Sequence, residues 1–239
     1  MRILSVDTTT FSCSVGVLEN GLLKAEATSE KKQTHSRHLM KMVDRVMRMA
    51  EMKLFELDAF AVVTGPGSFT GIRIGMGTIQ GFATALSKPV VGVSSLEALA
   101  RQVLPTSHLI CPLMDARKGE VYMALYRYEN ENLYQVMADR VASLESVLDR
   151  MVDGCLFIGS GVGIYEELIR KRLGGLARFA DQHLNKLRAE TVCRIAMHKI
   201  QTGDMDSETP LTPRYIRKSD AEIAVRTHEH SQSSSMGNY

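Results

Sequence analysis

The most informative stretch of this sequence runs from residue 59 to residue 77 and reads Ala59-Phe-Ala-Val-Val-Thr-Gly-Pro-Gly-Ser-Phe-Thr-Gly-Ile-Arg-Ile-Gly-Met-Gly77. Its apolar first five residues predict a buried strand, the Gly-Pro-Gly at 65–67 predicts a tight turn, and the proline-free segment after it predicts a helix. Ser68 is placed to cap the N-terminus of that helix. A strand, turn and helix in this order present free backbone N–H groups above the turn, which is one way to bind an anion.

The predicted helix carries four glycines, each of which costs about 1 kcal/mol of helix propensity relative to alanine. Gly71 and Gly75 are four residues apart, as are Gly77 and Gly81. The helix therefore has two surfaces of small residues against which another backbone could pack closely. Two interactions could offset the low helix propensity of the glycines: packing inside this chain, or contact with a helix of a partner protein.

Length and composition are those of an ordinary globular protein. The 239 residues allow one large or two modest domains, and 44% are hydrophobic and 23% charged. A net charge of +2 does not by itself indicate nucleic-acid binding. The four cysteines are dispersed without a Cys-x-x-Cys motif, which argues against a zinc cluster or a disulfide framework. Because no segment resembles a signal peptide or could span a bilayer, we expect a cytoplasmic protein with no membrane partner.

The predicted elements occur in two similar sets. The first set has strands at 2–6 and 13–18, a hairpin turn at Asn20-Gly21 into a third strand, a helix at 35–52, a strand at 59–63, the glycine-rich helix to 86, a strand at 89–93 and a helix at 94–103. The second set has strands at 108–114, 120–128, 133–137 and 155–158 and helices at 141–151, 163–173 and 191–201.

The repetition predicts a duplicated α/β fold with two lobes, each a mixed β-sheet flanked by helices. Asp7 ends the first strand and Asp115 ends its counterpart 108 residues later; the next strands align at an offset of 106, so the second turn is expected to be two residues shorter. The predicted lobes are residues 1–104 and 105–207. The segment at about 208–225 is expected to pack back on the first lobe, and 226–239 is expected to be a mobile tail.

Asp7 and Asp115 are the strongest candidates for chemistry. They could face each other across a cleft between the lobes, where a duplicated fold of this kind holds ATP and a metal ion; alternatively, each caps its own β-turn. His35 and His38 lie three apart without a carboxylate partner, which is a weak metal signal, so no metal site is predicted. The sequence has no Gly-x4-Gly-Lys-Ser/Thr and no Gly-x-Ser-x-Gly, which excludes a P-loop ATPase and a serine hydrolase of that type.

Five segments resemble the TsaB (YeaZ) family in order along the chain. They are Ile3-Leu-Ser-Val-Asp-Thr-Thr9, Gly65-Pro-Gly-Ser-Phe-Thr-Gly-Ile-Arg-Ile-Gly75, Val91-Gly-Val-Ser-Ser-Leu-Glu-Ala-Leu-Ala100, Asp115-Ala-Arg-Lys-Gly-Glu-Val-Tyr122 and Pro213-Arg-Tyr-Ile-Arg217. The resemblance implies an actin-like fold of the ASKHA, ribonuclease H-like type. It also implies a role in making threonylcarbamoyladenosine beside the anticodon of tRNA, as partner of the catalytic paralogue TsaD and the P-loop ATPase TsaE.

The resemblance also implies an absence of catalysis. The catalytic paralogue places a metal-binding His-x-x-x-His pair after the strand that corresponds to residues 91–93, and here those positions hold Ser95 and Leu99. Because leucine cannot ligate a metal, we expect a non-catalytic scaffold that activates the enzyme and requires no cofactor. The alternative is a self-sufficient ATP-dependent phosphotransferase of the ASKHA type that uses Asp7 and Asp115.

Two sets of site residues follow from these arguments. A cleft that could bind ATP or ADP weakly would include Asp7, Thr8, Thr9, Gly65, Gly67, Asp115 and Gly161. A partner interface on the helices at 35–52 and 71–86 would include Met42, Met49, Arg73, Ile74 and Thr78. Five of the 14 methionines fall between residues 40 and 52, where their flexible side chains suit an adaptable surface or an irregular core. The chain is expected to pair with TsaD or, when alone, with itself, and to reach tRNA through the complex.

Overall fold

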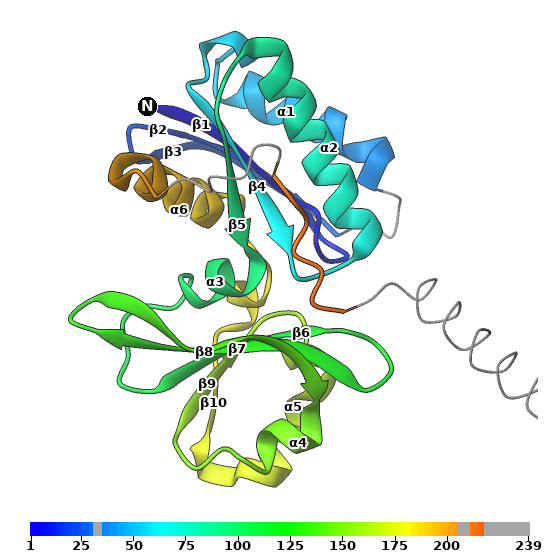
Figure 1. Ribbon diagram of the computed structural model, residues 1–239, viewed down its shortest axis with the longest axis vertical. Helices are drawn as coiled ribbons and strands as arrows, with labels where there is room; N and C mark the ends of the chain where they lie inside the picture. The colour runs from blue at the N-terminus through cyan, green and yellow to red at the C-terminus, as the bar shows by residue number, and fades with distance from the viewer. Residues whose placement is uncertain (31–34, 205–210, 218–239) are drawn as a thin grey trace, which may run out of the picture.

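The computed structural model describes residues 1–30, 35–204 and 211–217, which form two lobes, each built around a five-stranded mixed sheet (Figure 1). The first sheet contains β1 (Arg2–Asp7), β2 (Cys13–Glu19), β3 (Leu22–Ser29), β4 (Ala59–Gly65) and β5 (Val90–Ser94); the second contains β6 (Leu109–Asp115), β7 (Glu120–Glu129), β8 (Asn132–Ser143), β9 (Cys155–Ile158) and β10 (Ala177–Phe179). The helices are α1 (His35–Met49), α2 (Phe69–Leu86), α3 (Ser95–Ala100), α4 (Leu144–Leu148), α5 (Val162–Leu173) and α6 (Ala189–Thr202), with short 3-10 helices at Leu54–Glu56, Gly174–Leu176 and Gln182–Asn185.

Both sheets have the same connectivity. The strand orders are β3-β2-β1-β4-β5 and β8-β7-β6-β9-β10. In each lobe the first strand pairs antiparallel with the second and parallel with the fourth, as β1 does with β2 and β4, and β6 with β7 and β9. The predicted duplication of a mixed α/β lobe is therefore confirmed.

The strand registers correct the alignment of the two repeats. Asp7 lies opposite Ser14, seven residues later, whereas Asp115 lies opposite Val121, six residues later. The second turn is thus one residue shorter, and the expected difference of two was wrong. Sequence similarity between two short apolar strands does not fix their alignment to within one residue. It does not show which face of the sheet each side chain occupies.

The second lobe also differs from the prediction in two of its elements. The helix expected at 141–151 is shorter: residues 141–143 continue β8, where Ser143 lies opposite Glu120 of β7. The Ser143 side chain then accepts a hydrogen bond from the Ser146 N–H and caps α4. Strand β10 was not predicted, since three residues are too few to show a periodic pattern.

Helices cover both faces of the first sheet. On one face, α1 and α2 bury Leu39, Val43, Ile72 and Ile79, among others, in a core cluster with β1, β2 and β4. On the other face lies α6, whose Cys193 is fully buried against β1 and β2. The predicted lobe boundary assigned α6 to the second lobe; that assignment was wrong, because the apolar face of α6 packs on the first sheet.

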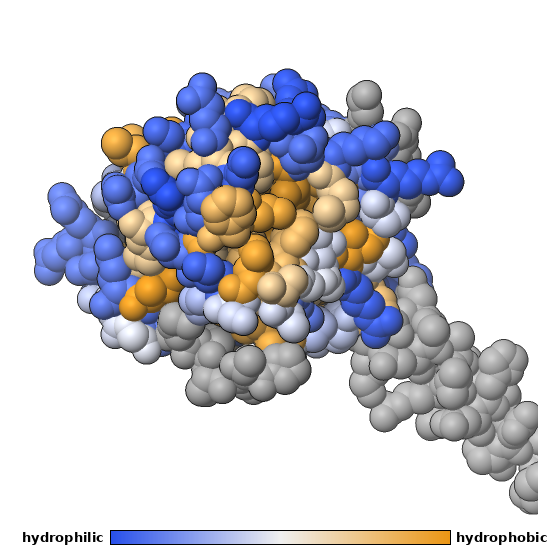
Figure 2. Space-filling view, turned by 90° about the horizontal axis from the view of Figure 1, so that it is seen from above, coloured by the Kyte–Doolittle hydropathy of each residue, from blue (hydrophilic) through white to orange (hydrophobic). Residues whose placement is uncertain are grey.

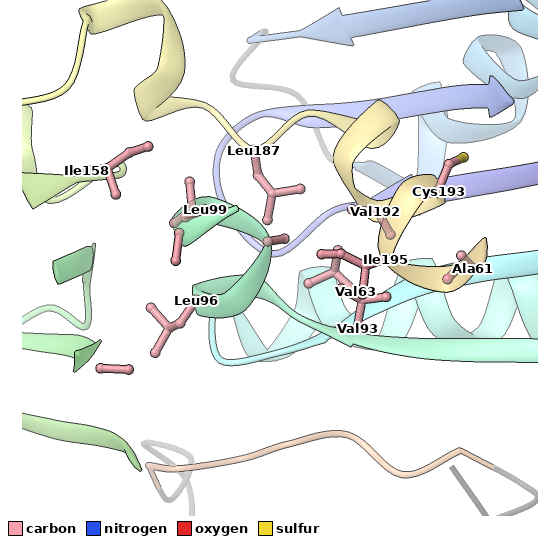
Figure 3. Packing of buried hydrophobic residues seen from close by; sticks show 14 of the residues in the cluster. Ala61, Val63, Val93, Leu96, Leu99, Ile158, Leu187, Val192, Cys193 and Ile195 are labelled. Carbon is pink, nitrogen blue, oxygen red and sulfur yellow. The ribbon is translucent and has the colours of Figure 1, made fainter. Parts of the chain in front are cut away.

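A continuous core joins the two lobes around α3. Figure 3 shows Leu99 of α3 between Ile158 of β9 and Leu187, which precedes α6, with Leu96 below Leu99 in the view; all four are buried. The part of the chain that the structure describes contains no helix long and apolar enough to cross a membrane.

Candidate functional site

A cavity of about 630 Å³ opens between the lobes, a size typical of small-molecule sites. Its walls come from the β1–β2 turn, the start of α1, the Gly-Pro-Gly turn with α2, the β6–β7 turn, the start of α5 and residues 214–217. Its lining residues are Thr9, Thr10, Phe11, His35, Ser36, Pro66, Gly67, Ser68, Phe69, Thr70, Gly71, Ile74, Met114, Asp115, Ala116, Arg117, Tyr122, Ser160, Ile164, Arg214, Tyr215, Ile216 and Arg217.

Asp7 and Asp115 both cap the turn that follows their own strand. Asp7 Oδ1 accepts hydrogen bonds from the Thr9 N–H (2.9 Å) and the Thr9 hydroxyl (2.7 Å). Asp115 Oδ1 accepts one from the Arg117 N–H at 2.9 Å. Of the two roles that the sequence left open for these residues, turn capping is therefore confirmed in both lobes.

Asp7 is fully buried, and Asp7 itself is not among the residues that line the cavity. Burial raises its pKa to about 6 against the two hydrogen bonds from Thr9, which favour the charged form. Its Oδ2 atom has no hydrogen-bond partner among the described residues. Asp115 is half-buried and lies on the cavity wall, so the two carboxylates do not face each other across the cleft.

The β1–β2 turn packs directly on the glycine-rich helix. The Thr8 hydroxyl donates to the Gly71 carbonyl, and a Cβ atom on Gly71 would lie 1.9 Å from the Thr8 carbonyl oxygen. A Cβ on Gly75 would lie 2.4 Å from Thr8 Oγ1. Close internal packing therefore explains this pair of glycines.

The N-terminal turn of α2 is less open to an anion than the sequence suggested. Ser68 caps the helix as predicted, with its Oγ accepting from the Gly71 N–H at 3.3 Å. The Ser68 N–H itself donates to the Thr9 carbonyl at 2.7 Å. The backbone of the β1–β2 turn thus occupies space above the Gly-Pro-Gly turn.

The predicted cleft residues fall into two groups. Thr9, Gly67 and Asp115 line the cavity, whereas Asp7, Thr8, Gly65 and Gly161 do not. Sequence reasoning missed Phe11, Ile164, Tyr215 and Arg217 as lining residues. Tyr215 and Arg217 belong to a segment that carries the family resemblance, and an apolar Phe11 in a hydroxyl-rich turn was the other available signal.

Ser95 and Leu99, which the family resemblance aligns with the metal-binding pair of the catalytic paralogue, are both buried. The Ser95 hydroxyl donates to the Pro66 carbonyl at 2.6 Å and is fully covered. Leu99 belongs to the core between the lobes, where a Cβ atom on Gly159 would lie 3.0 Å from Leu99 Cδ1. Among the described residues no group of three or more His, Cys, Asp or Glu side chains could hold a metal ion.

The predicted interface residues on α1 and α2 differ in their surroundings: Met42 and Ile74 pack against the first core cluster, and Ile74 also lines the cavity. Met49 and Arg73 are exposed, and Met42, Ile74 and Thr78 are half-buried. Figure 2, which views the molecule from above Figure 1, shows an apolar area bordered by hydrophilic side chains. Apart from the neighbouring backbone of α2 itself, nothing in the described chain lies within 4 Å of a Cβ atom built on Gly77 or Gly81. These two glycines remain unexplained by internal packing.

Comparison with known proteins gives consistent matches. The family model of TsaD, tRNA N6-adenosine threonylcarbamoyltransferase, matches residues 23–225. The tRNA threonylcarbamoyladenosine biosynthesis protein TsaB of Bacillus subtilis is 32% identical over 227 residues, which cover 93% of this chain and 96% of the relative. The Escherichia coli protein of the same name is 36% identical over 154 residues, 63% of this chain and 66% of the relative.

Comparison with solved structures gives matches to the same family and to the same fold. A Pseudomonas aeruginosa protein described as similar to peptidase YeaZ superposes with a TM-score of 0.74 at 28% identity, covering 90% of this chain and 99% of that one. The ethanolamine utilization protein EutJ of Carboxydothermus hydrogenoformans superposes with a TM-score of 0.53 at 11% identity, covering 80% and 89%, which indicates a shared fold alone. The chain therefore belongs to the TsaB (YeaZ) family and has an actin-like fold.

Proposed function

We propose that this chain is a non-catalytic scaffold subunit of the cytoplasmic complex that places the threonylcarbamoyl group on the adenosine next to the anticodon of tRNA. Its partners in this proposal are a TsaD-type catalytic paralogue and a TsaE-type P-loop ATPase, and tRNA is held by the assembled complex. The names of the Bacillus subtilis and Escherichia coli relatives support the pathway.

The observation that carries the non-catalytic part is the burial of Ser95 and Leu99. A metal-dependent transferase needs ligands that reach its substrate, whereas these side chains serve the Pro66 carbonyl and the core between the lobes. A packed leucine at a position that binds a metal in the paralogue can serve only as a structural contact. We infer that the paralogue catalyses the threonylcarbamoyl transfer.

The surface of α1 and α2 supports the pairing. Met49 is 52% exposed, and Phe55, just beyond α1, is 63% exposed. Gly77 and Gly81 leave space for close approach of another helix. When the chain is alone, the same surface would pair with its own copy about a two-fold axis, so each residue would appear on both sides of the contact.

Reconstitution tests the proposal. The purified chain, a TsaD-type and a TsaE-type protein from the same organism, tRNA and an activated threonylcarbamoyl donor are combined, and each protein is omitted in turn. We expect modified adenosine only when the TsaD-type protein is present, with a strong stimulation by this chain. Modification by this chain without the TsaD-type protein would overturn the proposal.

An ATP-dependent phosphotransferase is the rival, and the size of the cavity and the position of Asp115 on its wall favour it. The burial of Asp7 away from that wall weighs against it. We expect ATP or ADP to bind only weakly, with no turnover by the chain alone. Micromolar affinity with turnover that Asp115→Asn abolishes would favour the rival.

A further inference from the structure

Residues 211–217, which we call the strap, run along the first lobe toward the mouth of the cleft (orange in Figure 1). The Arg214 N–H donates to the Thr64 carbonyl at the end of β4 (2.9 Å). Gln80 Nε2 of α2 donates to the Leu211 carbonyl (3.2 Å). The strap is therefore fixed to the first lobe through backbone groups.

Tyr215 anchors the strap to the exposed surface of α2. Its ring stacks on Phe69 with centroids 4.4 Å apart, and its hydroxyl accepts a hydrogen bond from Arg73 Nε at 2.9 Å. The Arg73 guanidinium lies over the Phe69 ring, 3.9 Å from its centroid. Three side chains thus form one cluster that is shared between α2 and the strap.

The same segment also contacts the second lobe. Arg217 donates to the Ala116 carbonyl and lies 3.4 Å from Glu120 Oε2, on either side of the β6–β7 turn. Its side chain is only 15% exposed, so this pair is less screened than a surface ion pair. Arg214 Nη1 makes a longer contact of 3.9 Å to Asp139 Oδ2 of β8.

Two chain segments connect the lobes away from the strap: residues 101–108, between α3 and β6, and residues 180–188, between β10 and α6. One side chain holds these two segments together. Gln102, after α3, donates to the carbonyls of Leu184 (2.7 Å) and Lys186 (3.0 Å). It accepts a hydrogen bond from the Arg188 N–H at 2.7 Å. Figure 1 shows α3 on the left of the view and the strap on the right. The lobes are therefore joined by packed links on one side and by the strap on the other.

We propose that the strap is a latch that limits how far the two lobes open and ties that opening to the outer surface of α2. Lobes of this kind move about their connecting segments, and the contacts of Arg217 resist such a movement at the cleft mouth. Because Tyr215 shares a cluster with Arg73, anything that displaces Arg73 on the surface of α2 also loosens the latch. The inference concerns the isolated chain and stands whether or not the proposed scaffold function is correct.

Distance measurement between spin labels tests the latch. Thr84→Cys on α2 and Glu167→Cys on α5 introduce exposed thiols, whereas the four native cysteines are buried and are expected to stay unlabelled. In this background we expect Arg217→Met and Tyr215→Ala to shift the distance distribution to longer values and to broaden it. Arg172→Met removes a guanidinium that pairs with Asp149 on the surface of the second lobe and serves as the matched control.

Hydrogen exchange gives an independent readout. Losing the charged hydrogen bond to the Ala116 carbonyl should make the amides of residues 116–120 exchange about tenfold faster. Distances and exchange rates in Arg217→Met that match those of Arg172→Met would overturn the proposal. If Arg217→Met does not fold, Glu120→Gln probes the same contact from a half-buried residue; a smaller shift in the same direction is expected, and no shift overturns the latch.

Discussion

The hydroxyl of Thr8 donates a hydrogen bond to the carbonyl oxygen of Gly71 at 2.7 Å, which fastens the turn after the first strand to the first turn of α2. This contact brings the two segments into van der Waals contact along Gly71 and Gly75. It also explains why α2 is helical despite its glycines, because tertiary packing offsets the low helix propensity of glycine.

Gly71→Ala should therefore destabilise the protein, whereas Gly77→Ala should stabilise it. The new methyl group at 71 would lie 1.9 Å from the Thr8 carbonyl oxygen, and we expect a loss of about 2–4 kcal/mol in the free energy of unfolding. At 77 nothing lies within 4 Å, so better helix propensity should add about 1 kcal/mol. Urea denaturation measures both. Effects of the same sign and size would show that the turn does not constrain α2.

Asp7 should make the stability of the protein depend on pH. Burial raises its folded-state pKa to about 6, above the value near 4 of an unfolded chain, so the folded state holds the proton more tightly. This contribution is fully present below pH 4 and is lost as the pH rises through 6. At pH 8 the buried carboxylate costs on the order of 3 kcal/mol.

Asp7→Asn removes this titration. Measured by urea denaturation, the free energy of unfolding of the variant relative to wild type should rise between pH 4 and pH 7 and then level off. Thr64→Val, a buried change on the neighbouring strand β4 that removes no titratable group, is the control and should keep the wild-type dependence. A difference between Asp7→Asn and wild type that stays constant from pH 4 to pH 8 would contradict the assignment.

Ile74→Glu should separate partner binding from folding. Ile74 of α2 lines the cavity and packs against the edge of the first core cluster, but it is only half-buried. We therefore expect the variant to melt within a few degrees of wild type and to fail to co-elute with the TsaD-type paralogue in size-exclusion chromatography. Ile72→Glu places the same charge two residues earlier at a position that is 1% exposed, and it should unfold the protein. A folded Ile74→Glu variant that still co-elutes would show that the interface is misplaced.

Leu99→Ala tests whether this position serves the core between the lobes. Leu99 is 2% exposed within that cluster, and truncation of such a leucine costs about 2–5 kcal/mol. Leu104→Ala makes the same change at a side chain that is 83% exposed and should alter stability by less than about 0.5 kcal/mol. Thermal and urea unfolding of both variants decide the matter, and a Leu99→Ala loss as small as that of the control would refute a structural role.

Much of the fold could be predicted because its signals are local. The apolar run at 59–63, the Gly-Pro-Gly turn and the Ser68 cap each act on neighbouring residues, and the structure confirms the strand, turn and helix that they predict. The extent of β8 and the existence of β10 escaped prediction, since an edge strand depends on the partner with which it pairs.

Asp7 and Asp115 show the limit of such local reasoning. Both follow a buried strand and both cap a turn, so the sequence establishes their equivalence and the duplicated α/β fold around them. Their environments differ because the turn after Asp7 is pressed against α2, whereas the turn after Asp115 remains at the cavity wall. That difference, the position of α6 on the first sheet and the course of the strap all depend on contacts between residues more than sixty positions apart, for which no local pattern exists.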